Sequence, residues 1–465
     1  MDELELARLT FALTTIFHFI FVPASIGLAF VVAWCQTRHY RTGNPVYLRM
    51  TQFWAKFMLI SFALGVVTGI WQEFQFGMNW SAYSRYVGDV FGAPLAIEGL
   101  AAFFLESTFI GLWLFGRGRM RPGLHLATIW LVAIGTVLSA TFIIAANSWM
   151  QRPAGSEVVG GKAELVDIGA VLTNPLFILA LPHTVFAALL TGSMVVVAIS
   201  AWHLRRSNEV DLFTRSMRMA LPVVLVTTLV VFLSGDEFGR RLIEWQPMKM
   251  AAAEALFETE QPASLSLFAT GDFEGNPGET NRNIKIPHLL SLIATLSWDG
   301  EVRGINDIQA EYEQRYGPGD YVPIVGVAYW SFRIMITCAL ALIVLSAAGL
   351  WFARKGRLHA SRRYLGLAVA AVVLPFLGNT AGWMLAEMGR QPWVVQGLML
   401  TRDGISPNVS TAETVATLVV LVGVYSVLGA VGGWLVLREL RHGPPPEAAA
   451  DDRPDGQHPD LSLAY

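Results

Sequence analysis

The chain has 465 residues, of which 54% are hydrophobic and only 15% are charged, and its formal net charge is -3 at pH 7. This composition excludes an ordinary soluble globular protein and is typical of an integral membrane protein. The charge gives no reason to expect nucleic acid as a partner. Cys35 and Cys338 are the only cysteines and both fall in apolar segments, so neither a disulfide framework nor a CxxC-type metal site is expected.

Apolar spans dominate the chain from its start. A spanning helix needs about 20 mostly apolar residues, and nine segments meet this requirement. They lie at about residues 10–35, 53–75, 94–115, 124–147, 176–204, 218–235, 323–352, 364–387 and 413–437. Because the first five residues are acidic, unlike the start of a cleavable signal, we expect the first span to be retained. The sequence therefore predicts an all-α integral membrane protein with about nine transmembrane helices.

The connections between the spans alternate in positive charge. Arginines are frequent after the odd-numbered spans, as at Arg38, Arg41 and Arg117, and are sparse in the short connections on the other side. By the positive-inside rule, the N-terminus is outside and the C-terminus is cytoplasmic.

This topology predicts four segments. Residues 1–235 form the first six transmembrane helices. Residues 236–322 form an external loop, which is a candidate binding loop because it is much longer than a simple connection. Residues 323–442 form the last three helices. Residues 443–465, rich in Pro, Ala and Asp, form a disordered cytoplasmic tail.

Two carboxylates fall inside the third span, where such groups are costly unless they have a function. Glu98 and Glu106 are eight residues apart, so they project on roughly the same side of one helix and can belong to one polar track.

Side chains that can donate a lone pair to iron occur at similar depths in the outer half of the membrane: His18, His183, Met335 and Glu387. A His/Met pair is a recognised axial set for a low-spin heme. The pattern thus favours several hemes near one face. The two histidines and Met335 also have a simpler interpretation, because a lone His can bond to a neighbouring helix and Met is a common filler of apolar helices.

Three other charged residues have alternatives of the same kind. Arg333 could meet a heme propionate or could extend to the membrane interface as an ordinary snorkelling arginine. Lys249 and Glu254, in the external loop, could bind a ligand or could form an ordinary solvated helix pair.

Two other classes of protein are compatible with these features. A di-heme subunit that only relays electrons would contain low-spin heme alone. A secondary transporter could use Glu98 and Glu106 as a proton site, but such folds carry internal repeats with broken helices, and the sequence shows no such repeat.

The chain resembles subunit I of the cytochrome bd-type quinol oxidases over nearly its whole length before the tail. Several motifs occur in the family's order. They are Phe17–Phe19, Ile97–Thr108, Asn147–Gln151, Leu181–Thr184, Gly235–Glu237, Gln246–Lys249, Phe332–Met335 and Gly389–Trp393.

The resemblance implies three hemes and a set of residues that bind them. His183 and Met335 would be the axial ligands of a low-spin heme b (b558). His18 and Glu387 would serve a high-spin heme b (b595) and heme d, in an order that the resemblance leaves open. The other residues implied at the hemes are Glu98 beside the high-spin pair, Arg333 and Arg390 as partners of heme negative charge, and Trp393 in the motif that follows Glu387.

The resemblance also implies a proton path and a quinol site. Glu106, Ser107 and Ser139 would belong to the path, with His125 at its cytoplasmic mouth. Lys249 and Glu254 would bind quinol in a loop of the short type, which leaves ubiquinol and menaquinol as alternatives.

We therefore expect a quinol:oxygen oxidoreductase in a bacterial or archaeal cytoplasmic membrane. It would oxidise quinol at the outer face and reduce dioxygen to water with cytoplasmic protons, so that it generates a membrane potential without pumping. Membrane lipids and a second large membrane subunit are the implied partners. Whether a small single-span subunit is also present is left open.

Overall fold

The computed structural model describes residues 2–273 and 279–446. Within these residues, nine helical segments are long and apolar enough to cross a membrane, as predicted. Six of them are α1 (Glu3–Thr42), α2 (Pro45–Met78), α5 (Pro122–Gln151), α7 (Pro175–Arg205), α8 (Val210–Trp245) and α12 (Val325–Arg354). The others are α16 (Thr411–His442), the pair α13 (Arg362–Ala370) and α14 (Val373–Met388), and a composite third span.

The third span, Pro94–Phe115, is built from three pieces. It comprises the end of α3 (Ser81–Ile97), the π-helix η1 (Glu98–Phe103) and α4 (Phe104–Phe115). π-helical turns inside α-helices occur frequently at functional sites. Here the wide turn begins at Glu98, one of the two carboxylates singled out in the sequence.

Local sequence signals explain where the helices begin. A reciprocal capping box between Asp2 and Glu5 starts α1, and another between Ser410 and Glu413 starts α16. Proline occupies the first position of α2, α5 and α7, where its missing N–H costs no hydrogen bond.

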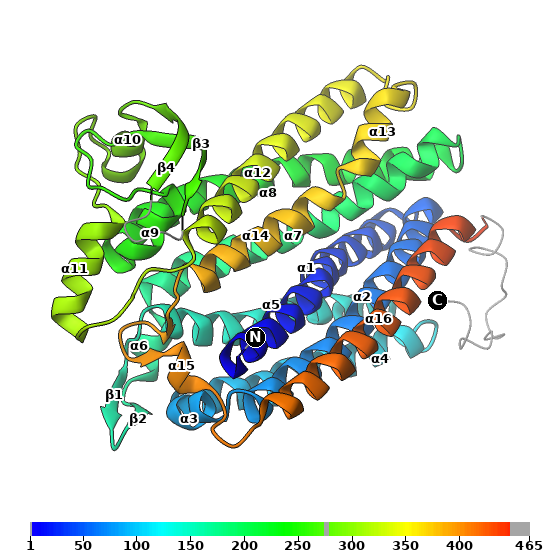
Figure 1. Cartoon of the computed structure of the whole chain (residues 1–465). Helices are drawn as coiled ribbons and strands as arrows, with labels where there is room; N and C mark the ends of the chain where they lie inside the picture. The colour runs from blue at the N-terminus through cyan, green and yellow to red at the C-terminus, as the bar shows by residue number, and fades with distance from the viewer. Residues whose placement is uncertain (1, 274–278, 447–465) are drawn as a thin grey trace.

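The long helices form one bundle, with a smaller folded region at one end (Figure 1). α1 begins at this end, and α16 ends at the opposite end (Figure 1). The predicted tail, 443–465, falls outside the described residues from 447 onward, so only its first residues are described.

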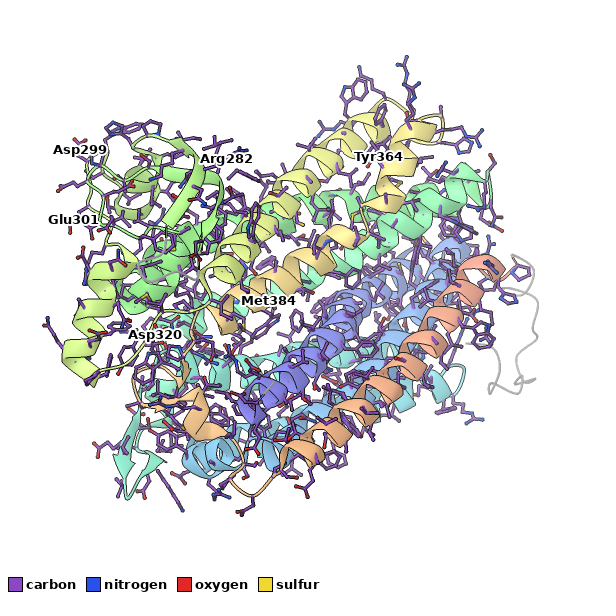
Figure 2. All side chains as sticks on the ribbon, in the orientation of Figure 1. Arg282, Asp299, Glu301, Asp320, Tyr364 and Met384 are labelled. Atoms are coloured by element: carbon purple, nitrogen blue, oxygen red, sulfur yellow. The ribbon has the colours of Figure 1, made fainter. Side chains whose placement is uncertain are left out.

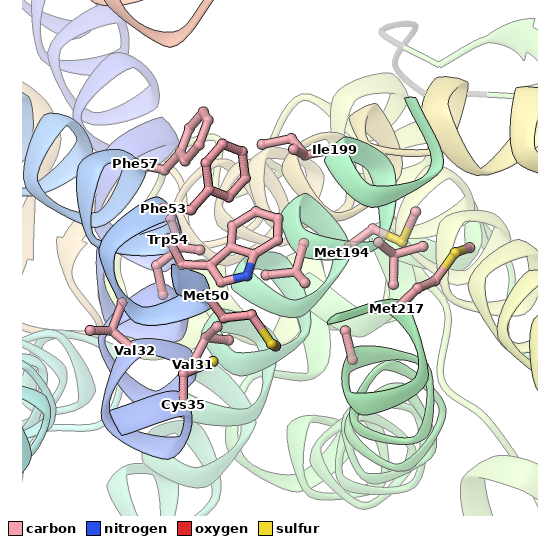
Figure 3. Close-up of a cluster of buried hydrophobic side chains, with 14 of the residues drawn as sticks. Val31, Val32, Cys35, Met50, Phe53, Trp54, Phe57, Met194, Ile199 and Met217 are labelled. Carbon is pink, nitrogen blue, oxygen red and sulfur yellow. The ribbon is translucent and has the colours of Figure 1, made fainter. Parts of the chain in front are cut away.

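The helix core lies where α1, α2, α7 and α8 pack together (Figure 3). Val32, Phe53 and Met194 are fully buried there. α1 and α7 approach closely because Gly27 and Gly192 face each other. A Cβ atom added to Gly27 would overlap the carbonyl oxygen of Ala188, and one added to Gly192 would overlap the backbone of Gly27. Small residues allow such backbone contact between membrane helices.

The region between α8 and α12, residues 246–273 and 279–324, is called the loop region below. It contains α9 (Pro247–Glu254), the antiparallel hairpin of β3 (Leu265–Asp272) and β4 (Glu279–Ile286), α10 (Leu289–Thr295) and α11 (Ile305–Tyr316). α8 continues to Trp245, beyond the predicted end of the sixth span at residue 235.

The loop region has its own apolar core. Ala251 and Ala252 of α9 pack with Ile308 of α11 and Tyr329 of α12, which seats α9 in the protein interior. Charged side chains such as Asp299 and Glu301 lie on the outer rim of the region, far from Tyr364 at the other end of the bundle (Figure 2).

Small elements complete the fold at the same end. They are the antiparallel pair β1 (Ser156–Val159) and β2 (Lys162–Leu165), the short helix α6 (Ile168–Leu172), the antiparallel pair β5 (Trp393–Val395) and β6 (Met399–Leu400), and α15 (Thr401–Gly404).

Candidate functional site

A cavity of about 650 Å³ opens among α1, α2, η1, α4, α5, α7 and α14. Its size is within the usual range of small-molecule and cofactor sites. Six of the residues predicted from the sequence line it together: His18, Glu98, Glu106, Ser139, Glu387 and Arg390. Helices far apart in the chain thus bring two predicted iron ligands and two intramembrane carboxylates to one chamber.

His18 is held in a tautomer suited to metal ligation. Its Nδ1 lies 2.9 Å from the Thr68 hydroxyl, which itself donates to the carbonyl of Leu64 at 2.8 Å. Since the hydroxyl proton is already used, the Thr68 oxygen accepts from Nδ1–H, and the lone pair of His18 lies on Nε2. Such a hydrogen bond behind the ring is how proteins commonly orient metal-binding histidines.

Glu387 sits at the end of α14 with its carboxylate in a hydrogen-bond network. Asn147 Nδ2 donates to Oε1 at 2.7 Å, and Arg390 Nη2 pairs with Oε2 at 2.5 Å. Arg390 is only 3% exposed, and its Nε and Nη1 have no acceptor among the described residues. Buried guanidinium donors are normally paired, so this cavity wall fits an anionic group such as a propionate.

The carboxylates of the third span differ in their contacts. Glu98 accepts a hydrogen bond from the Ser139 hydroxyl at 2.8 Å. Glu106 is 7% exposed, and its Oε1 has no partner among the described residues. Ser139 therefore contacts Glu98 directly, whereas Ser107 is half-buried and is not part of the cavity lining.

His183 and Met335 are not part of this lining and lie in a group of four helices that shares α7 and α14 with the cavity. α7 packs against α8, α8 against α12, α12 against α14, and α14 against α7, so these four helices form a closed ring. His183 Nδ1 lies 3.0 Å from the Ser234 hydroxyl of α8, and the Met335 sulfur lies 3.4 Å from where a Cβ atom at Gly382 of α14 would be. Each predicted ligand is thus turned toward another helix of the ring.

Lys249 and Glu254 are buried, at 4% and 3% exposure, so their interpretation as an ordinary solvated helix pair is wrong. α9 is held inside the protein by its alanines, and each charge has a partner from another element. Lys249 Nζ donates to Gln151 Oε1 at 2.5 Å, and Glu254 pairs with Arg333 at 2.6 Å.

Burial sets the protonation of both loop residues. Burial, reinforced by the positive charge of Arg390 and opposed by Glu387, lowers the pKa of Lys249 to about 7. Burial raises the pKa of Glu254, against the opposing effect of Arg333. Arg333 also donates to the Ser266 carbonyl at 2.8 Å and stacks over Tyr329, so it is a fixed internal cation and not a snorkelling arginine.

Trp393 lies at the junction of the loop region and the bundle. Its ring stacks on Tyr321 at a centroid distance of 5.5 Å. It borders a small void of about 10 Å³ that Lys249 and Arg390 also line, and it is not part of the larger cavity wall.

His125 has both ring nitrogens in contacts at the other end of α5. Gln36 Nε2 lies 2.9 Å from Nδ1, and the Trp113 carbonyl lies 2.8 Å from Nε2. The ring also stacks on the Trp113 indole. These contacts hold His125 between α1, α4 and α5.

Sequence reasoning assigned no role to Asn147, Gln151 or Gln246. All three join the network around Lys249 and Glu387. Asn147 and Gln151 could have been noticed in the sequence, since amides at the end of an apolar span need hydrogen-bond partners. Their partners could not be identified, because they lie on α9 and α14, far along the chain.

The fold and the cavity define a mostly helical, multi-span membrane protein with an internal cavity of the size of a small-molecule or cofactor site. The family model of cytochrome bd terminal oxidase subunit I matches residues 6–444. The chain therefore belongs to this family.

Relatives of known identity agree over nearly the whole chain. The cytochrome bd ubiquinol oxidase subunit 1 of Bacillus subtilis (strain 168) is 47% identical over 444 residues, which are 95% of this chain and 94% of that protein. The cytochrome bd-II ubiquinol oxidase subunit 1 of Escherichia coli (strain K12) is 35% identical over 501 aligned positions, covering 95% and 97%. The bd oxidase structure from Geobacillus thermodenitrificans superposes with a TM-score of 0.87 at 30% identity, covering 95% of this chain and 99% of that chain.

Proposed function

We propose that this chain is the heme-bearing subunit of a terminal respiratory oxidase that oxidises quinol and reduces dioxygen to water. The family makes it an oxidase subunit of the respiratory membrane, and the two curated relatives are named ubiquinol oxidases. The observation that carries the proposal is the cavity in which the Nε2 lone pair of His18 is available to a metal ion, Glu387 is held by hydrogen bonds, and Arg390 keeps two unpaired donors among the described residues.

We assign three hemes to two places in the chain. His183 and Met335, in the ring of α7, α8, α12 and α14, would hold a low-spin heme b (b558). His18 and Glu387 would serve a high-spin heme b (b595) and heme d, with Arg390 as a charge partner. When bound, these groups supply one-electron transfer and the centre at which dioxygen is reduced.

Quinol would bind in the loop region at Lys249 and Glu254. Oxidation of a quinol releases two protons, and an amine with a pKa of about 7 can accept one of them at physiological pH. Glu254 and Arg333 together give the site a buried ion pair that can meet the polar head of the substrate.

The protons that form water would come from the opposite side of the membrane. The positive-inside rule places the loop region outside and the C-terminus in the cytoplasm. Ser139 and Glu98 form a hydrogen-bonded pair at the cavity, and Glu106 has a free carboxylate oxygen there. We assign these groups to the proton path, with Ser107 beside Glu106 and His125 nearer the cytoplasm, so that charge is separated without a pump.

The other partners follow from the family. The chain would assemble with a second large membrane subunit in a bacterial or archaeal cytoplasmic membrane. Ubiquinol and menaquinol are both compatible with the loop site.

An optical spectrum of the purified oxidase tests the proposal. Reduced enzyme should show both low-spin and high-spin heme bands, and carbon monoxide should shift the high-spin bands only. His183→Ala should remove the low-spin band, and Met335→Leu should leave a five-coordinate iron with a lower reduction potential, because thioether ligation raises it. Low-spin heme alone, with no band that responds to carbon monoxide, would identify an electron-relay subunit instead.

A further inference from the structure

Gln151, the last residue of α5, joins the loop region to the cavity. Lys249 Nζ donates to Gln151 Oε1 at 2.5 Å, while Gln151 Nε2 lies 3.1 Å from the Ala386 carbonyl and 3.4 Å from Glu387 Oε1. Because an ammonium group only donates, Lys249 must face the amide oxygen, and the NH₂ group is thereby turned toward α14. At 3% exposure, Gln151 is screened from bulk water.

The two contacts of this amide cannot change independently. The oxygen and nitrogen share one rigid plane, so a rotation that follows a displaced Lys249 also alters the contact with Glu387. Gln246 holds the amide from the loop side, since its Nε2 lies 3.0 Å from Gln151 Oε1 and 2.5 Å from the Gln151 carbonyl. The elements that carry these groups, α5, α9 and α14, meet at the loop end of the bundle (Figure 1).

We propose that Gln151 is a positioning residue that couples occupancy of the loop site at Lys249 to the hydrogen bonding of Glu387. The inference rests on the proposed function, in which Lys249 binds quinol and Glu387 faces a heme. A substrate oxygen that accepts a hydrogen bond from Lys249 competes with Gln151 for the ammonium protons. The amide then turns, and its N–H donor moves relative to the Glu387 carboxylate.

This link is separate from the proposed low-spin heme site. It runs from α9 to α14 through one side chain and touches neither His183 nor Met335. Since coupling between two sites is reciprocal, a change at Glu387 would also alter the affinity of the loop site.

The test uses the complete purified oxidase and an alkyl-substituted hydroxyquinoline N-oxide, a redox-inert mimic of the quinol head group. Two quantities are followed: the dissociation constant of the mimic, and the shift that it causes in the absorption bands and midpoint potentials of the high-spin hemes. We expect a shift in the wild type. Gln151→Met, which removes both contacts, should abolish the shift.

Two further variants make the test specific. Gln151→Glu keeps an oxygen for Lys249 but offers no amide N–H to Glu387, so the mimic should still bind while the shift is lost. Gln75→Met is the matched control, because Gln75 is a fully buried glutamine whose described partner is Asn79 and which does not line the cavity. This control should keep the shift.

The outcomes separate the inference from the function on which it rests. No shift in the wild type, an unchanged shift in both Gln151 variants, or an equal loss in Gln75→Met would overturn the coupling. If Lys249→Ala bound the mimic as tightly as the wild type, the proposed quinol site itself would fail. Weaker binding in Lys249→Ala, together with a retained shift in Gln151→Met, would overturn only the coupling.

Discussion

The loop region and the cavity differ in whether their buried charged groups have partners within the chain. In the loop region, Lys249 and Glu254 are buried but each is paired within the chain. In the cavity, Arg390 keeps two unpaired donors and Glu106 an unpaired oxygen among the described residues. Unpaired buried polar atoms are costly, so a bound group that paired with these cavity atoms would remove that cost. The charged groups of the loop region are already paired, and a ligand there would have to displace a partner.

Substitution of Glu106, in the cavity, should give the largest effect on activity. Glu106→Gln keeps the size and one hydrogen-bonding oxygen but cannot exchange a carboxyl proton. We expect heme content and quinol-driven heme reduction to be retained, while steady oxygen consumption falls by about 10²-fold or more. Charge separation in proteoliposomes should fall in parallel. Wild-type oxygen consumption with full membrane potential would make Glu106 a structural residue.

Substitution of Lys249 tests the other side of the comparison, the loop region. Lys249→Ala should lower kcat/KM for quinol by about 10- to 100-fold, the usual value of a buried hydrogen bond to a charged group, with the heme spectrum intact. Turnover equal to that of the wild type, measured over a range of quinol concentrations, would remove Lys249 from the quinol site.

The pH dependence of quinol oxidation gives a second test of Lys249. Because burial lowers the pKa of Lys249 to about 7, with Arg390 and Glu387 as its charged neighbours, the neutral amine that can accept a proton is populated above that pH. The value of kcat/KM for quinol should therefore rise as the pH increases through about 7. This rise should be absent in Lys249→Met, and its persistence there would assign it to another group.

Thr68 tests whether the cavity orients its ligands in advance. Thr68→Val keeps the shape but removes the oxygen that accepts from His18 Nδ1. We expect heme affinity at the cavity to fall by about 10- to 100-fold, measured as heme content per protein after mild detergent washing. Thr51→Val is the matched control on α2, since among the described residues the Thr51 hydroxyl bonds only its own helix, at the Tyr47 carbonyl. Equal heme loss in both variants would exclude a specific role for Thr68.

The smallest effect is expected at the close contact between α1 and α7. Gly192→Ala places a methyl group against the backbone of Gly27, and overpacking of this kind costs about 1–3 kcal/mol. The apparent unfolding temperature should drop by a few degrees, measured by circular dichroism in detergent. Gly423→Ala adds a methyl group where, apart from the adjoining backbone of its own helix, no atom of the described residues lies within 4 Å, and it should not lower this temperature.

The spans and four polar residues of the cavity could be predicted from the sequence, because charged and lone-pair side chains in apolar helices are too costly to be common without a function. His18, Glu98, Glu106 and Glu387 stood out for that reason, and the structure brings them to one cavity. The burial of α9 could not be predicted. A Lys and a Glu on a short helix of a polar loop have an ordinary solvated interpretation, and only the long-range packing of Ala251 and Ala252 overrides it. The Lys249–Gln151 contact was missed because it joins segments far apart in the chain.

The contact between Gly27 and Gly192 also aligns the two histidines of α1 and α7. Gly27 follows His18 by nine residues, and Gly192 follows His183 by nine residues. The two helices run in the same direction (Figure 1), so each imidazole lies about 14 Å along its helix from the shared contact point. The glycine pair thus acts as a spacer that sets both histidines at one level of the bundle.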